Sequence, residues 1–75
     1  MRYSILGESM KILIKLREYR NEKGYTYLDM SKLLNISKPF YWQIENGKRR
    51  LTYDMAKKIA SIFNVKPDEI FYDEF

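Results

Sequence analysis

The side chains best suited to chemistry in this chain are hydrogen-bonding groups in one short stretch, residues 37–47. Lys38 and Gln43 lie there beside the only tryptophan, Trp42. In the major groove of DNA, a lysine can donate to guanine O6 and N7, and a glutamine can pair with adenine N6 and N7. These residues therefore predict recognition of base edges, with Pro39 and Trp42 adding apolar contact. The alternative for Trp42 is packing over lysine or arginine stems, or at a protein interface.

Catalysis and metal binding have little support in the composition. The chain has no cysteine and no histidine, which removes thiolate ligands, the commonest metal ligand and the usual general base. Asp29, Glu45 and Asp54 each have a helix-capping or ion-pairing explanation, so no acidic cluster is left over. We therefore expect no enzyme, no cofactor and no metal site.

The net charge of +4 is unevenly distributed along the 75 residues. Residues 1–64 hold thirteen Lys or Arg against six Asp or Glu, a net charge of +7, whereas residues 65–75 carry −3. A basic body favours a polyanionic partner, although a solvated charged surface that keeps a small domain soluble is an equal alternative. No apolar run reaches the ~18 residues of a membrane span, and no signal peptide is evident, so we expect a cytoplasmic protein with no membrane partner.

Residues 37–47 have the start and stop signals of a helix. Ser37 is a helix cap, Pro39 falls in the first turn where a missing amide does no harm, and Gly47 can adopt the left-handed conformation that ends a helix. At about 100° per residue, one face is predicted to be exposed and the other to face a core. The exposed face holds Lys38, Pro39, Trp42, Gln43 and Asn46, and the core face holds Phe40, Tyr41 and Ile44.

Four further helices are predicted around this stretch, with no strand pattern. A first helix is expected to run from a Ser9 cap to Lys23, a second follows the Thr26 cap to about residue 34, and Thr52 caps a fourth that ends near Phe63. A short fifth helix starts at Pro67. The inward positions of the fourth helix are expected to be Tyr53, Ala56, Ile59, Ala60 and Phe63. The domain is thus all-α and spans residues 9–75, after an N-terminal arm at residues 1–8.

Several runs of residues together resemble the phage-repressor (Cro/C1, or XRE) helix-turn-helix family. The matching pieces are Leu16 with Tyr19-Arg20, Lys23-Gly24-Tyr25-Thr26, Ile36-Ser37, Ile44-Glu45-Asn46-Gly47-Lys48-Arg49 and Ile59-Ala60. The resemblance implies a compact five-helix, lambda-repressor-like DNA-binding domain. Its second and third helices form the helix-turn-helix, and the third enters the major groove of double-stranded DNA. The family usually acts as a homodimer on a two-fold symmetric operator.

The resemblance also implies which residues contact the phosphate backbone. The expected contacts are Thr26, Tyr27, Ser37, Asn46, Lys48, Arg49, Arg50, Thr52 and Tyr53. Helix starts at Thr26 and Thr52 add amides that suit a phosphate. Tyr27 departs from the family pattern, which usually has a glutamine there that holds both a phosphate and the recognition helix. For Arg49 and Arg50 the alternative is an ordinary solvated basic loop.

Glu45 is expected to be structural, because an acid in the last turn of a helix opposes the helix dipole and would repel phosphate. The family pattern pairs it with Arg20 of the first helix, an ion pair that would fix the third helix against the first. Removing one partner of such a pair would cost ~3–5 kcal/mol if it is buried.

Two functions of the DNA-binding class remain open. The first is a sequence-specific transcriptional regulator, favoured as a repressor. The second is an antitoxin that also binds a partner protein through the arm or through the tail Phe71-Tyr72-Asp73-Glu74-Phe75. Dimer packing or a capped chain end is the alternative for that tail.

Overall fold

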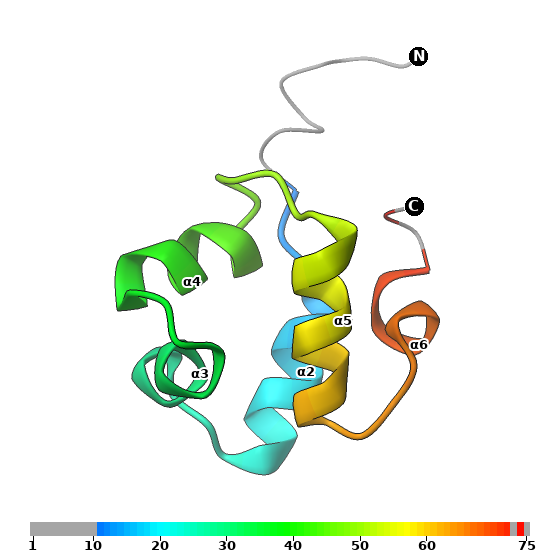
Figure 1. Cartoon of the computed structure of the whole chain (residues 1–75), viewed down its shortest axis with the longest axis horizontal. Helices are drawn as coiled ribbons and strands as arrows, with labels where there is room; N and C mark the ends of the chain where they lie inside the picture. The colour runs from blue at the N-terminus through cyan, green and yellow to red at the C-terminus, as the bar shows by residue number, and fades with distance from the viewer. Residues whose placement is uncertain (1–10, 73, 75) are drawn as a thin grey trace.

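The computed structural model describes residues 11–72 and 74 (Figure 1). Within these residues the chain forms five helices and no strand: α2 (Ile14–Lys23), α3 (Tyr27–Leu34), α4 (Lys38–Glu45), α5 (Tyr53–Ile62) and α6 (Pro67–Phe71). The all-α prediction is confirmed. The predicted arm at residues 1–8 and the Ser9 cap lie outside the described residues.

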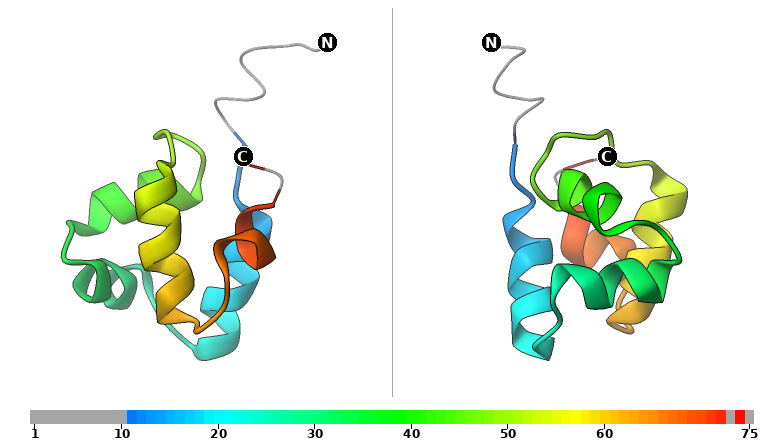
Figure 2. Two further views of the ribbon diagram at one scale, coloured as in Figure 1. Left: turned by 45° about the vertical axis from the view of Figure 1, so that its right-hand side comes forward. Right: turned by 90° about the vertical axis from the view of Figure 1, so that its left-hand side faces the viewer.

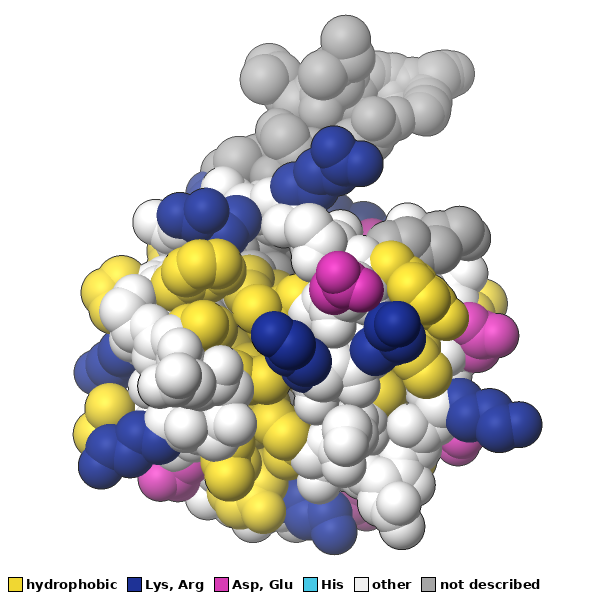
Figure 3. Space-filling model, in the orientation of Figure 1, with side chains coloured by type: hydrophobic (Ala, Val, Ile, Leu, Met, Phe, Trp, Pro, Cys, Tyr) yellow, Lys and Arg dark blue, Asp and Glu magenta, His cyan; other side chains and the backbone are white. Residues whose placement is uncertain are grey.

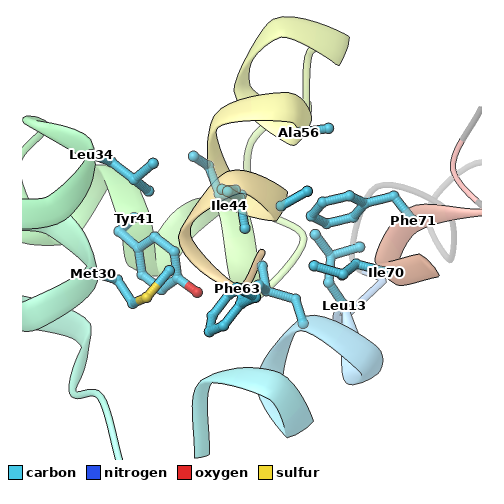
Figure 4. Packing of buried hydrophobic residues seen from close by; sticks show 12 residues of the cluster. Leu13, Met30, Leu34, Tyr41, Ile44, Ala56, Phe63, Ile70 and Phe71 are labelled. Atoms are coloured by element: carbon cyan, nitrogen blue, oxygen red, sulfur yellow. The ribbon is translucent and has the colours of Figure 1, made fainter. Parts of the chain in front are cut away.

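One apolar cluster lies where the five helices meet, and every helix contributes to it (Figure 4). Leu16, Met30, Tyr41 and Ile59 have no exposed surface. Burial of such side chains is worth about 1.5–3 kcal/mol each, which makes this cluster the main source of stability. The buried apolar residues are Leu13, Leu16, Met30, Leu34, Tyr41, Ile44, Ala56, Ile59, Ala60, Phe63, Ile70 and Phe71.

A tight turn joins α3 to α4 and makes the helix-turn-helix. Asn35 has a positive φ of 59°, as expected of a residue that tolerates the left-handed conformation, and the amide of Ile36 donates to the carbonyl of Ser31 at 2.9 Å. Ser31 is only 2% exposed, and its small side chain lets the two helices approach closely. Seen from the side, α4 lies at the molecular surface above α3 (Figure 2, right).

The first helix starts later than the sequence predicted. Residues 11–13 are not helical and α2 begins at Ile14. The reason is tertiary: the amide of Leu13 donates to the backbone carbonyl of Glu45 at 2.9 Å, and the Leu13 side chain is buried. This segment therefore crosses the end of α4, where the backbone of Lys11 lies directly against Gly47.

The exposure of two side chains differs from what the sequence suggested. Tyr53, expected inward, is 50% exposed because it is the first residue of α5 and points away from the cluster, with the Lys57 ammonium 5.4 Å from its ring. Phe71, part of the tail considered for partner binding, is only 1% exposed because it closes the core beside Ile70. Phe71 is therefore not available as a contact surface.

Candidate nucleic-acid interface

The outward face of α4 carries the side chains that the sequence suggested for base contact. Lys38 and Pro39 are exposed, Trp42 is 41% exposed, and Gln43 is half-buried. On the inner face, Tyr41 and Ile44 are buried, with 0% and 1% exposure. The predicted orientation of the helix is confirmed. Phe40, expected in the core, is half-buried at the flank.

Side chains next to the two ends of α4 cap the helix. The Ser37 hydroxyl oxygen accepts from the amide of Phe40 at 3.1 Å, and Pro39 lies in the first turn. At the other end, the Asn46 side-chain amide donates to the carbonyl of Trp42 at 3.0 Å, and Gly47 turns the chain with a φ of 73°. An eight-residue helix is too short to be stable alone, so these caps and the buried face determine that it forms.

Three side chains converge on the carboxylate of Glu45, which has no exposed surface. The Arg20 guanidinium donates to its two oxygens at 2.7 and 2.9 Å, and the Tyr41 hydroxyl donates at 2.7 Å. Arg17 adds a hydrogen bond of 3.1 Å. The sequence suggested Arg20 and Glu45 as partners but missed Arg17, although its spacing of three residues from Arg20 places both on one side of α2.

The hydrogen bonds decide the charge state of this site. Burial favours the neutral acid, but the donors Arg20, Tyr41 and Arg17 together outweigh it and hold the pKa of Glu45 below its ordinary value. Burial, with the adjacent Glu45 charge, raises the pKa of Tyr41. Glu45 is therefore an ionised acceptor at neutral pH and Tyr41 a neutral donor.

Asn46 is tied to the first helix as well as to α4. The terminal nitrogen Nη2 of Arg17 donates to Asn46 Oδ1 at 2.9 Å. Since the Asn46 amide nitrogen already donates to Trp42, one amide hydrogen is left for an outside acceptor such as a phosphate. Arg17 thus fixes the end of α4 through two residues, Glu45 and Asn46.

Arg49 does not extend away from the loop after α4. Its Nε donates to Gln43 Oε1 at 2.9 Å, and its guanidinium carbon lies 4.2 Å from the ring centroid of Phe40. The side chain therefore runs back along the flank of the helix. The sequence did not indicate this arrangement, because it depends on how the loop folds back.

Three hydroxyl groups among the expected phosphate contacts act as helix caps. Oxygens of Thr26, Ser37 and Thr52 accept from backbone amides at 3.0, 3.1 and 3.2 Å. A hydroxyl that accepts in this way keeps its own hydrogen for donation, so each cap can still bind an anion. At Thr26 the cap is reciprocal: Asp29 accepts from the Thr26 amide at 2.9 Å, and this bond lowers the pKa of Asp29.

Tyr27 packs over the buried ion pair. The Arg20 guanidinium carbon lies 4.4 Å from the centroid of its ring, and the Tyr41 ring lies at 6.1 Å. The aromatic ring, which a glutamine would lack, therefore covers the Arg20 side chain. Its half-buried position leaves the tyrosine at the edge between core and surface.

Positive charge borders the outward face of α4. Lys38, Lys48, Arg49 and Arg50 are all exposed. Lys and Arg side chains gather along the upper edge of the face shown in Figure 3, where the loop after α4 lies. Such an arrangement of positive charge favours a polyanionic partner.

The part of the chain that the structure describes has neither a metal-ligand cluster nor a membrane-spanning helix. No group of three or more acidic side chains there can hold a metal ion. None of the helices in that part is both long and apolar enough to cross a bilayer.

The chain is similar to proteins named as HTH-type transcriptional regulators. A model of the helix-turn-helix family matches residues 16–70. An uncharacterized HTH-type transcriptional regulator of Methanocaldococcus jannaschii is 38% identical over 60 residues, 80% of this chain and 91% of that protein. The uncharacterized HTH-type transcriptional regulator YqaF of Bacillus subtilis is 38% identical over 45 residues, 60% of this chain and 59% of that protein.

A longer relative contains the same unit. A putative HTH-type transcriptional regulatory protein of Pyrococcus furiosus is 32% identical over 60 residues, which is 76% of this chain but only 19% of that protein. No solved structure matches the chain at comparable significance.

Proposed function

This chain belongs to the Cro/C1-type (XRE) helix-turn-helix family of DNA-binding transcriptional regulators, and we propose that it represses transcription by binding a specific operator through α4. The observation that carries the proposal is the orientation of α4. Its outward face combines the exposed Lys38 with Gln43 and Trp42, while the buried Tyr41 and Ile44 anchor it from behind. A rigid helix with polar groups on its outer face is what readout in the major groove requires.

Base contacts are assigned to Lys38, Pro39, Trp42 and Gln43. Lys38, the first residue of α4, donates to a guanine, since residues at the start of a recognition helix reach base edges. Gln43 keeps both amide hydrogens and one oxygen lone pair, and pairs with an adenine. Trp42 and Pro39 offer apolar contact, for example with a thymine methyl group.

Phosphate contacts position the helix. The capping hydroxyls of Thr26, Ser37 and Thr52 donate to phosphate oxygens, and Lys48 and Arg50 add charge. Tyr27 and Tyr53 contribute through their hydroxyl groups, and Asn46 contributes through its remaining amide hydrogen. These contacts carry no sequence information but account for much of the affinity and its dependence on salt. The side chain of Arg49 lies beside α4 and does not extend from the loop.

A homodimer on a two-fold symmetric operator completes the proposal. One α4 covers only a few base pairs, and a second copy would double the contacts on a half-site about 34 Å away, one turn of DNA. A repressor then acts by occupying a promoter. The buried Phe71 removes one side chain from the surface that the alternative antitoxin function would use.

The test is selection of bound sequences from a random double-stranded DNA pool. We expect a two-fold symmetric motif for the wild type. Lys38→Ala should relax one position of the motif and Gln43→Ala should relax at least one, each worth ~1–3 kcal/mol of discrimination. Lys15→Ala, an exposed lysine of α2, is the matched control and should leave the motif unchanged. If no motif emerges, or if Gln43→Ala selects the wild-type motif intact, the base-reading role of α4 is refuted.

A further inference from the structure

We propose that Arg49 is a specificity-determining residue that reads a guanine, and that Phe40 and Gln43 are positioning residues that hold its guanidinium in place. This inference rests on the proposed function and deepens it. It differs from the role suggested by the sequence, in which Arg49 is one of several basic residues on the phosphate backbone.

The guanidinium of Arg49 lies beside the candidate recognition helix. Arg49 belongs to the loop after α4, but its guanidinium carbon is 4.2 Å from the ring of Phe40, the third residue of the helix. Its Nε contacts Gln43, one turn further along. Phe40 and Gln43 are separated by about 4.5 Å along the helix axis, so the guanidinium lies beside the first two turns of α4. That part of a recognition helix enters the major groove.

Arg49 still has hydrogen-bond donors that can reach a base. The Nε hydrogen is used by Gln43, and one face of the guanidinium covers the Phe40 ring. The two terminal nitrogens keep their four hydrogens in one plane, a fork that matches the O6 and N7 acceptors of guanine. A phosphate needs only a nearby charge, whereas this fixed planar fork suits bidentate recognition of a base.

Arg49 differs from Arg17 and Arg20 in the charge of its partners. Arg17 and Arg20 are both paired with the buried carboxylate of Glu45. Across residues 11–72 and 74, Arg49 has only neutral partners, an aromatic ring and an amide oxygen, and it is exposed. These contacts orient the side chain without cancelling its charge. Much of the conformational entropy of the Arg49 side chain is thus already lost in the free protein, so less is lost on binding. This pre-organisation favours specificity for one base.

The decisive variant is Arg49→Lys, which keeps the charge but loses both the planar fork and the Nε bond to Gln43, so its ammonium group is no longer held in place against one guanine. In selection from a random DNA pool, we expect one guanine of the wild-type motif to become degenerate, with discrimination there falling roughly 5- to 150-fold. The other positions should persist. Lys15→Arg, a charge-conserving change at an exposed position of α2 outside the proposed interface, is the control, and it should select the complete wild-type motif.

A second measurement addresses the base directly. Replacing that guanine by 7-deazaguanine removes the N7 acceptor and should weaken binding of the wild type about 5-fold or more. It should change binding of Arg49→Lys little. Phe40→Leu, which retains apolar bulk but removes the ring, should lower this sensitivity to N7 while the melting temperature and the rest of the motif stay close to those of the wild type.

The outcomes separate this inference from the proposed function. If the wild type selects a motif and Arg49→Lys selects the same motif with every guanine retained, the inference is overturned and the proposed function stands. Equal sensitivity of wild type and Arg49→Lys to 7-deazaguanine would overturn it as well. A wild type that selects no motif overturns both.

Discussion

Arg20 of α2 and Glu45 of α4 meet in two hydrogen bonds of 2.7 and 2.9 Å in the core, and they join the first described helix to the end of the candidate recognition helix. The remaining partners of the carboxylate, Tyr41 and Arg17, come from the same two helices. The position of α4 therefore depends on a charged network as well as on apolar packing.

Arg20→Met should lower the free energy of unfolding by about 3 kcal/mol, the lower end of the range for breaking a buried pair, because Arg17 still bonds to Glu45. Urea denaturation at neutral pH measures this loss. Lys57→Met is the matched control: it breaks the Lys57–Asp54 pair, whose side chains are 56% and 87% exposed, and should cost under ~1 kcal/mol. Equal losses for the two variants would show that the buried pair is not formed in solution.

The same network predicts acid sensitivity. The folded-state pKa of Glu45 is below its ordinary value, so its contribution to stability is fully present above about pH 4.3, the unfolded pKa, and is lost as the pH falls below it. Glu45→Gln should be less stable at neutral pH and should have a shallower fall in stability below pH ~4.3. Asp29, whose pKa is also lowered, keeps part of the acid dependence in both proteins. Glu22→Gln, at an exposed position, should show the wild-type profile.

The raised pKa of Tyr41 predicts that the protein loses stability at high pH. Because burial raises its folded-state pKa, its contribution is present below about pH 10, the unfolded pKa, and is lost as the pH rises above it. Tyr41→Phe should flatten the decline in stability above that pH. Tyr72→Phe, at a side chain that is 71% exposed, is the control that should retain the wild-type decline.

Local signals in the sequence were enough for most of the fold. The caps at Thr26, Ser37 and Thr52 and the left-handed residue Asn35 formed as predicted, because each depends on neighbours within three or four residues. The outward face of α4 followed from helical periodicity in the same way.

Long-range contacts were the part that sequence reasoning missed. The late start of α2 results from the bond between Leu13 and Glu45, which are 32 positions apart in the sequence. The contact between Arg17 and Glu45, and the return of Arg49 along α4, likewise require the folded arrangement of segments. No local pattern encodes the bond of Leu13 or the return of Arg49, so these two contacts could not have been predicted from one sequence. The spacing of Arg17 from Arg20 gave a partial signal for the third contact.

Gly47 and Gly24 provide a matched pair for testing how residues 11–13 pack on the end of α4. Both have nearly the same positive φ, 73° and 74°, so alanine carries a similar backbone cost of ~1–2 kcal/mol at each. A Cβ at Gly24 meets nothing within 4 Å, whereas one at Gly47 would collide with the backbone of Lys11. Gly47→Ala should therefore be more destabilising than Gly24→Ala by ~1–3 kcal/mol in urea denaturation.

The losses of stability in these two variants decide whether Lys11 packs against Gly47. An equal loss for both would mean that Lys11 does not lie against Gly47 in solution. A larger loss for Gly47→Ala, accompanied by faster exchange of the Leu13 amide hydrogen, would place the defect at the bond between Leu13 and Glu45.

Tyr27 stands where the family usually has a glutamine, and its two parts have separable roles. The ring covers Arg20 at 4.4 Å, and the hydroxyl is proposed to reach a phosphate. Tyr27→Phe keeps the ring, so the melting temperature should change little while DNA binding weakens equally for all sequences. Tyr27→Ala removes both parts and should lower stability as well. Binding titrations at several salt concentrations, alongside thermal melts, distinguish these effects. If Tyr27→Phe binds DNA as tightly as the wild type, the hydroxyl makes no phosphate contact and the residue serves only to cover the ion pair.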